Sequence, residues 1–279
     1  MVNSNKSIYQ DLSDERKQLQ SVGKLPQWYS TSAWQLLKEK YTTDKYPDLY
    51  SIYKRISNAA SKHMDDEEHW DKVFFNLLWS GHLACSTRRG AWAGYIEIDH
   101  PDFWEVVAYI LNNPDDCNVG WLVSDKFIQE LENGNEESIN RYQRALKTKM
   151  VTGKGYFVFI DRVNRANPES YKKHGLTVKA SNLCTEITLP SDEFHTFTCV
   201  LSSMNLAKYD EWKDTDAVQN AIIFLDCVAE EFIQMGRGIK GLEKAVRFTE
   251  SGRALGLGTL GFHSYLQQNM IDIESTEAH

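Results

Sequence analysis

The sequence predicts an α/β protein whose first part is helical and whose remainder alternates strands with helices. Residues 9 to 84 carry apolar side chains at spacings of three and four, which is the period of an amphipathic helix. From residue 88 onward, short apolar runs rich in β-branched and aromatic residues alternate with helical stretches. Alternation of this kind is typical of a largely parallel sheet or barrel.

Four helices are expected in the first part, with a break near Gly23 to Pro26. They cover Tyr9–Gln20, Ser32–Tyr41, Pro47–Met64 and Glu68–His82. The stretch His63–His69 concentrates acidic and histidine side chains, which suggests either a metal site or the start of a helix. Carboxylates are stabilised near the positive end of a helix, so we favour the helix start and expect no metal ligands.

In the second part, the predicted strands and helices alternate. Strands are expected over Ala91–Ile98, Cys117–Val123 and Tyr156–Ile160, and helices over Phe103–Leu111, Asp125–Leu131 and Glu137–Thr148. The apolar run Phe157–Ile160 ends at Asp161, which suits a strand buried on both faces whose carboxyl end opens onto a site. After Pro190 we expect a loop, then helices over Thr215–Met235 and Leu242–Glu250, and a glycine-rich end.

Composition narrows the class of protein. The chain has 279 residues and a formal net charge of -8, which argues against a general nucleic-acid binder, although a nucleotide-sized ligand remains open. The start, Met1–Gln10, is polar and no run of about 18 apolar residues occurs, so we expect a cytoplasmic protein without a membrane segment. The five cysteines form neither a CxxC pair nor an even set, which predicts reduced thiols.

One glycine motif suggests a function that its context does not support. Gly256–Gly261 satisfies GxGxxG, the fingerprint of dinucleotide-binding folds, which requires a strand before it and a helix after it. The preceding segment, Lys244–Arg253, looks helical instead. We therefore expect no nicotinamide or flavin site there.

The candidate for chemistry is Cys184, which alternates with Asn182 and Glu186. On an extended segment these three side chains would point the same way. The thiol could be a nucleophile, a metal ligand or a hydrogen-atom abstractor. A nucleophile requires a base and positive surroundings, whereas the nearby charge is the Glu186 carboxylate. A thiol beside a base and an amide fits radical chemistry on a polyol better, and a buried strand cysteine between two solvated polar groups is the structural alternative.

Several segments in order resemble ribonucleotide reductase large subunits. Ser181–Ile187, followed by Leu189 and Pro190, resembles the family's finger loop, whose cysteine becomes a thiyl radical. Arg88–Tyr95 with Asp99–Phe103 resembles the second specificity loop and the strand and helix after it. The other similar segments are Tyr156–Asn167, Thr198–Leu206 and Gly252–Gly258. The resemblance spans nearly the whole chain.

By this resemblance, residues 1–87 would form a helical lead-in. Residues 88–279 would form a partial ten-stranded α/β barrel with the finger loop around 181–190. Cys184 would be the thiyl radical that takes the ribose 3′-hydrogen, Glu186 the base for the 3′-hydroxyl, and Asn182 a hydrogen-bond partner of the ribose. Cys199 would be one of two thiols that reduce the 2′-carbon.

The resemblance also implies ligands and partners. The substrate-binding residues would be Thr87, Ser181, Asn182, Leu183, Cys184 and Glu186, and the specificity loop would contain Arg88, Arg89, Gly90 and Ala91. The chain itself would bind no metal or other cofactor. A class I type is expected, with the radical supplied by the metal cofactor of a small radical-generating subunit; cobalamin is the alternative source. An external thiol reductant, a ribonucleotide substrate, nucleotide effectors, other large-subunit fragments and an oligomeric assembly complete the expected partners.

The sequence departs from the family pattern between Thr87 and Arg88, which are adjacent. In the family, a block with the first barrel strands, the partner of the redox cysteine and the first specificity loop lies there. Cys85 is the nearest substitute for that partner thiol. The departure leaves two hypotheses: a part of a split enzyme that other chains complete, or a non-catalytic remnant or interaction module of a reductase complex.

Overall fold

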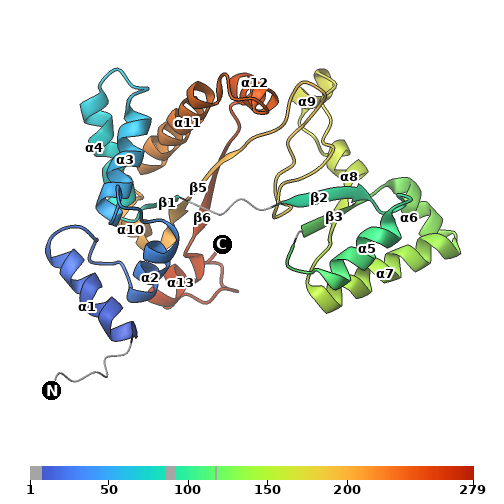
Figure 1. Ribbon diagram of the computed structural model, residues 1–279, viewed down its shortest axis with the longest axis horizontal. Helices are drawn as coiled ribbons and strands as arrows, with labels where there is room; N and C mark the ends of the chain where they lie inside the picture. The colour runs from blue at the N-terminus through green and yellow to red at the C-terminus, as the bar shows by residue number, and fades with distance from the viewer. Residues whose placement is uncertain (1–7, 86–91, 117) are drawn as a thin grey trace. The chain divides into compact units, whose positions relative to one another are not determined.

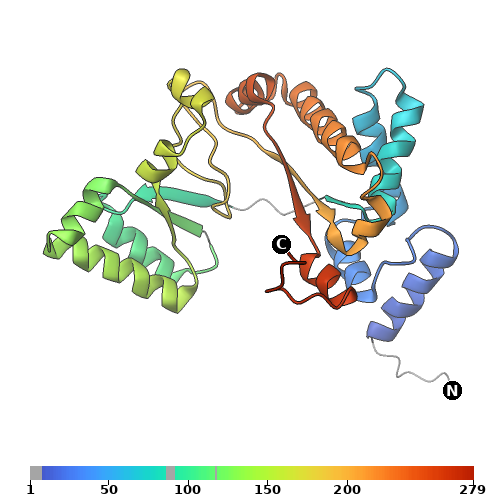
Figure 2. The same ribbon diagram turned by 180° about the vertical axis from the view of Figure 1, so that it is seen from behind.

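The computed structural model describes residues 8–85, 92–116 and 118–279. The chain forms two compact units (Figures 1 and 2). Unit 1 combines residues 1–86 with residues 198–279, and unit 2 consists of residues 87–197. Among the described residues, no helix has both the length and the apolar composition needed to cross a bilayer.

Unit 1 begins with four helices that lie within three residues of their predicted bounds. They are α1 (Ile8–Ser21), α2 (Thr31–Lys40), α3 (Leu49–Ser61) and α4 (Glu67–Trp79). The acidic stretch before α4 starts that helix: the Asp66 side chain accepts a hydrogen bond from the His69 backbone N–H at 3.1 Å, and Glu67 and Glu68 occupy the first turn. An N-cap carboxylate satisfies a backbone donor that the helix leaves open.

The rest of unit 1 is a three-stranded sheet with helices around it. Its strands are β1 (Leu83–Cys85), β5 (Val200–Asn205) and β6 (Leu255–Leu260), in the order β1-β5-β6. Strand β1 runs antiparallel to β5, and β5 runs parallel to β6. The helices are α11 (Ala217–Gly236) and α12 (Glu243–Gly252), which connect β5 to β6, the short η1 (Leu206–Lys208) and α10 (Tyr209–Trp212), and α13 (Phe262–Gln268).

The GxGxxG stretch lies in this sheet. Its first five residues belong to strand β6, and helix α12 precedes it. The helix expected before the motif is confirmed. Because a dinucleotide fold would place the glycines in a turn after a strand, the described geometry differs from that fingerprint.

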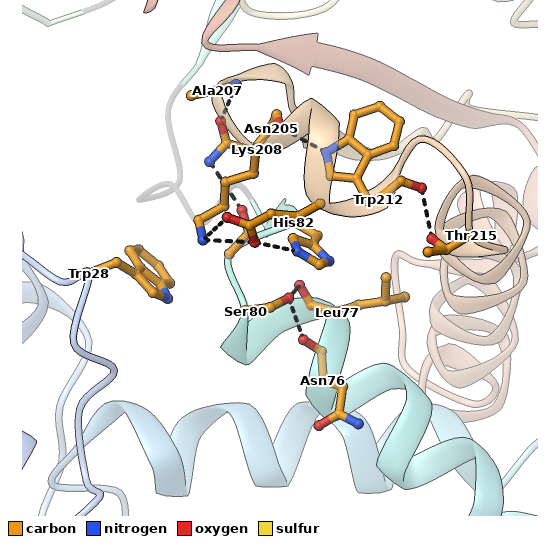
Figure 3. Close-up of polar contacts among 12 residues, drawn as sticks. Trp28, Asn76, Leu77, Ser80, His82, Asn205, Ala207, Lys208, Trp212 and Thr215 are labelled. Atoms are coloured by element: carbon orange, nitrogen blue, oxygen red, sulfur yellow. Dashed lines mark hydrogen bonds and ion pairs between the residues drawn. The ribbon is translucent and has the colours of Figure 1, made fainter. Parts of the chain in front are cut away.

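Polar contacts at the end of β5 fix its pairing with β1 (Figure 3). The Asn205 backbone N–H donates to the His82 carbonyl oxygen at 2.8 Å, and the Asn205 side-chain amide donates to the Gly81 carbonyl oxygen at 3.1 Å. The Glu211 carboxylate lies 3.0 Å from the His82 ring and accepts from Lys208 at 3.2 Å. Bonds from one residue to two consecutive carbonyls leave little freedom for the strands to shift in register.

Arg253 holds the end of α12 to α11. Its guanidinium donates to the Asp226 carboxylate and to the Glu230 carboxylate, each at 2.7 Å, and to the Asp226 carbonyl oxygen at 3.0 Å. Its backbone is left-handed, with φ at 39°. Residues other than glycine rarely adopt this backbone region, so the three hydrogen bonds of the Arg253 side chain offset an unfavourable backbone conformation.

We expect Arg253→Ala to lower the free energy of unfolding by about 2 kcal/mol, because charge-assisted hydrogen bonds contribute about 1.5–3 kcal/mol. Urea unfolding measures the change. Arg237→Ala, which removes a more exposed ion pair with Glu250, is the control and should cost below about 1 kcal/mol. Equal losses in both variants would contradict the role of Arg253.

The pH dependence of the same contact has a defined sign. The Arg253 hydrogen bond, with smaller contributions from Gln234 and the charges of Arg253 and His63, holds the pKa of Glu230 below its ordinary value of 4.5. A carboxyl with a lowered pKa stabilises the fold above that ordinary value and loses its contribution as the pH falls through the folded-state pKa. The difference between wild type and Arg253→Ala should therefore shrink in acid.

Unit 2 is built on a parallel three-stranded sheet. Its strands are β2 (Ala93–Glu97), β3 (Asn118–Val123) and β4 (Tyr156–Phe159), in the order β2-β3-β4. The helices are α5 (Phe103–Asn112) between β2 and β3, α6 (Asp125–Glu132) and α7 (Glu136–Thr152) between β3 and β4, and then α8 (Ile160–Arg165) and α9 (Glu169–Lys173). This order matches the predicted alternation of strands and helices.

The two faces of the unit 2 sheet differ. On one face, Val119, Trp121 and Val123 of β3 pack with apolar residues of α5, α6 and α7 into a buried core. Because side chains alternate along a strand, Gly120 lies on the other face. Tyr95 is paired with Gly120 across β2 and β3, so it shares that face. The face opposite α5, α6 and α7 therefore carries a tyrosine beside a glycine.

The predicted α/β class is confirmed. Within the described ranges, each sheet has three strands and no barrel closes, as expected for part of a barrel. The strand expected through Ile160 ends at Phe159 because α8 starts at Ile160, and only Val158 of β4 is buried. The division at residue 87 into a lead-in and a barrel stays a prediction.

Candidate active site

The segment around Cys184 is a tight turn, which we call the cysteine turn (residues 182–185). The Thr185 backbone N–H donates to the Asn182 carbonyl oxygen at 3.1 Å and closes it. Thr185 has a φ of 68°, in the left-handed region. The expectation of an extended segment is wrong here, because a positive φ reverses the chain where a strand would continue. Alternation therefore does not place the three side chains together.

Asn182 holds the cysteine turn by its side chain instead. Its Oδ1 accepts from the backbone N–H groups of Glu186 at 3.1 Å and Ile187 at 3.0 Å. Its Nδ2 donates to Glu186 Oε1 at 2.8 Å. The amide and the carboxylate predicted to act together are thus in contact, through a local hydrogen-bond network rather than through a shared strand face.

This network leaves donors and acceptors for a ligand. A side-chain amide has two N–H donors, and Asn182 uses one of them on Glu186. The Glu186 side chain is exposed and its second carboxylate oxygen is an additional acceptor. Cys184 is also exposed. The turn therefore presents a thiol, a carboxylate and an amide donor, which are the groups that a hydrogen-atom abstractor with a base and a ribose contact would use.

Residues before the turn, within it and on the neighbouring sheet hold it in place. Ser181 is only 7% exposed, and its hydroxyl donates to the Ile187 carbonyl oxygen at 2.6 Å. Leu183 is half-buried. From the sheet face opposite α5, α6 and α7, Tyr95 Oη donates to the Asn182 carbonyl oxygen at 2.5 Å. No sequence pattern indicates this contact between Tyr95 and Asn182. If the pairing of β2 with β3 were known, the position of Tyr95 opposite Gly120 would indicate that the ring has room on this face.

Cys199 belongs to unit 1, immediately before strand β5. It is half-buried. Its neighbour Thr198 makes a hydroxyl–hydroxyl hydrogen bond of 2.6 Å with Thr249, a buried residue of α12. This bond connects the residue before Cys199 to helix α12.

Cys85 is not within disulfide reach of Cys199. In the antiparallel pair of β1 and β5, the Cα partner of Cys85 is Ser202, three residues beyond Cys199. With about 3.3 Å per strand residue, the two cysteine Cα atoms are at least about 10 Å apart. A disulfide requires about 4.4 to 6.8 Å between Cα atoms. The described β1–β5 register therefore argues against Cys85 as the partner thiol.

The remaining predicted site residues lie outside the described ranges. They are Thr87 and the specificity-loop residues Arg88, Arg89, Gly90 and Ala91. Their predicted roles stay predictions.

Three cysteines differ in environment, and we expect their alkylation rates to follow it. Cys184 is exposed, Cys199 half-buried and Cys227 buried, and burial raises the pKa of the Cys227 thiol to about 11. Because the thiolate is the reactive form, a maleimide at neutral pH should label Cys184 first and Cys227 only after unfolding. Peptide mass spectrometry follows each site. Early labelling of Cys227 in the folded protein would contradict the described packing.

Comparison with known proteins places this arrangement in a family. The family model described as "Ribonucleotide reductase, barrel domain" matches residues 139–279. A putative ribonucleoside-diphosphate reductase large subunit of Frog virus 3 (isolate Goorha) is 33% identical over 225 residues, which cover 73% of this chain and 39% of that protein. The chain thus spans about two fifths of that relative.

A solved structure and a more distant relative agree with this result. The class Id ribonucleotide reductase alpha subunit of Actinobacillus ureae has a TM-score of 0.62 and 28% identity, over 99% of this chain and 61% of that one. A vitamin B12-dependent ribonucleoside-diphosphate reductase of Mycobacterium tuberculosis (strain CDC 1551 / Oshkosh) is 28% identical over 219 residues, which cover 68% of this chain and 29% of that protein.

The family model describes residues 139–279 as a barrel domain, and the described part of the chain contributes parallel β–α–β units and an exposed cysteine on a hydrogen-bonded turn. The class is therefore a thiol-bearing α/β barrel protein, of which this chain is a part. The matched range contains Asn182, Cys184, Glu186 and Cys199. The chain belongs to the ribonucleotide reductase large-subunit family.

Proposed function

We propose that this chain is the cysteine-bearing part of the catalytic core of a ribonucleoside-diphosphate reductase. The observation that carries the proposal is the cysteine turn, where Glu186 is bonded to Asn182 and Cys184 is exposed. Exposure alone would not assign a reaction to this thiol, whereas membership of the reductase family supports radical chemistry. The chain spans only part of its relatives, so the activity requires the remaining barrel segments.

In the proposed reaction, a radical source supplies the unpaired electron. Cys184 Sγ, as a thiyl radical, takes the ribose 3′-hydrogen and becomes a thiol. The Glu186 carboxylate takes the proton of the 3′-hydroxyl, and the remaining Asn182 N–H orients the ribose. The 2′-hydroxyl leaves as water with a proton from one of two reducing thiols, of which Cys199 is one. Together the two thiols supply two electrons and two protons, one for the water and one for the new 2′-carbon–hydrogen bond, and they end as a disulfide. Glu186 returns its proton to the 3′-oxygen, and return of the hydrogen atom from Cys184 to the 3′-carbon restores the thiyl radical.

The partners follow from the same proposal. The radical comes from a small subunit with a metal cofactor, the class I arrangement, and cobalamin is the alternative that the mycobacterial relative's name raises. An external thiol reduces the resulting disulfide. Nucleotide effectors, further large-subunit segments and an oligomeric assembly in the cytoplasm complete the proposal.

A non-catalytic role is the second candidate, because Thr87 directly precedes Arg88 where the family pattern has a longer block. A reduction assay separates the two functions. The complex that contains this chain is incubated with ribonucleoside diphosphates and a dithiol, with each radical source in turn. Deoxyribonucleotide product with either source supports the enzyme. Absence of product with both sources, from an intact complex, supports the non-catalytic role.

A further inference from the structure

A single tyrosine hydroxyl spans the cysteine turn. Tyr95 Oη donates to the Asn182 carbonyl oxygen at 2.5 Å and lies 2.9 Å from Thr185 Oγ1. Asn182 and Thr185 are the first and last residues of the turn, and their own backbone bond is 3.1 Å long. Cys184 lies between these two residues. The phenol therefore contacts both ends of the turn that presents the thiol.

The direction of these hydrogen bonds follows from the inventory of donors. A carbonyl oxygen only accepts, so the one phenolic hydrogen goes to Asn182. The Thr185 hydroxyl must then donate to Tyr95 Oη. Thr185 is β-branched and has a φ of 68°, a conformation that such residues rarely adopt. The hydrogen bond that Thr185 donates to Tyr95 thus stabilises the least favourable residue of the turn.

Gly120 provides the space that the Tyr95 ring occupies. The two residues are Cα partners across β2 and β3, on the sheet face opposite α5, α6 and α7. A Cβ atom added at Gly120 would lie 2.2 Å from one ring carbon of Tyr95 and 2.4 Å from the next. Real Cβ atoms do not approach other atoms so closely. Any side chain at position 120 must therefore displace the ring.

The geometry points to Tyr95 as a positioning residue for the cysteine turn, with Gly120 as the residue that makes its position available. Tyr95 fixes the ends of the turn and thereby the relative placement of Cys184 and Glu186. The importance of Tyr95 for catalysis rests on the proposed reductase function. The effect of Tyr95 on the structure of the turn does not depend on that function. Hydrogen exchange of the turn can consequently test the inference apart from activity.

The experiment compares Tyr95→Phe with Tyr142→Phe by hydrogen–deuterium exchange. Tyr142 is the matched control because it lies on α7 and packs with Phe157 in the core on the helix face. Loss of two hydrogen bonds should speed exchange of the 181–187 peptide by about 5-fold to 30-fold in Tyr95→Phe. The control should leave it unchanged. Unchanged exchange in Tyr95→Phe would overturn the inference.

Gly120→Ala gives a second test with the phenol retained. It should speed exchange of the same peptide, and if it fails to fold, Tyr95→Phe decides alone. In the assembled reductase, Tyr95→Phe should lower kcat about 10-fold or more while KM changes little, because the phenol orients the turn without touching substrate. Faster exchange in a complex without reductase activity would support the positioning role and contradict the proposed function.

Discussion

Replacing Cys184 with Ser should abolish ribonucleotide reduction while the assembled complex remains intact. The hydroxyl is nearly isosteric with the thiol, and the side chain is exposed on the cysteine turn, so folding should be unaffected. An O–H bond is much stronger than an S–H bond, so serine cannot carry the radical at this position. We expect a loss of about 10⁴-fold or more, the scale on which removal of a covalent catalytic group acts.

Product assays and native mass measure the two parts of this prediction separately. Thr188→Ser is the control, since Thr188 is exposed in the same segment and has no role in the proposed reaction. The control should retain full turnover. If Cys184→Ser also turned over normally, the chain would have no radical cysteine at this position.

Replacing Asn182 with Asp should separate the structural role of this side chain from its catalytic role. In the variant, one carboxylate oxygen takes the place of Asn182 Oδ1 and can still accept from the Glu186 and Ile187 backbone N–H groups. The other carboxylate oxygen replaces the Asn182 Nδ2 donor, which in the wild type lies 2.8 Å from Glu186 Oε1. The two negative charges then repel each other. We expect the turn to persist and Glu186 to move away from its position.

Activity of Asn182→Asp should fall about 100-fold, because a displaced base loses much of what general base catalysis contributes, about 10²–10⁴-fold. Asn112→Asp, on an exposed position of α5, is the control and should change nothing. Equal activity of Asn182→Asp and wild type would show that the Asn182–Glu186 bond has no catalytic role.

Local periodicity predicted much of the fold. The helices α1 to α7 and the strands of unit 2 were predicted within a few residues because each is specified by its own spacing of apolar side chains. Strands β1, β5 and β6 were missed. Strand β1 has three residues, β6 contains two glycines, and the pairing of Cys85 with Ser202 joins segments that are far apart in the sequence. The periodicity of apolar residues and the strand propensity of single residues are local signals, so neither predicts that pairing.

In the candidate site, too, the sequence predicted local features better than contacts between distant segments. The sequence motif predicted the residues Asn182, Cys184 and Glu186, but their alternation suggested a strand. A turn forms because Asn182 accepts from two later backbone N–H groups, and Thr185 takes a positive φ that its residue type disfavours. The Tyr95 contact comes from a strand 87 residues earlier in the chain, so sequence spacing could not indicate it.

The central claim is that this chain supplies the radical cysteine of a ribonucleotide reductase whose other segments complete it. Gentle purification of the tagged chain from its native host, followed by native mass spectrometry with identification of every polypeptide present, tests this claim most directly. We predict a complex that contains further reductase large-subunit segments together with a radical-generating subunit. Recovery of the chain alone, or with partners unrelated to reductases, would contradict the claim. The cysteine turn would then be a structural feature without a catalytic role.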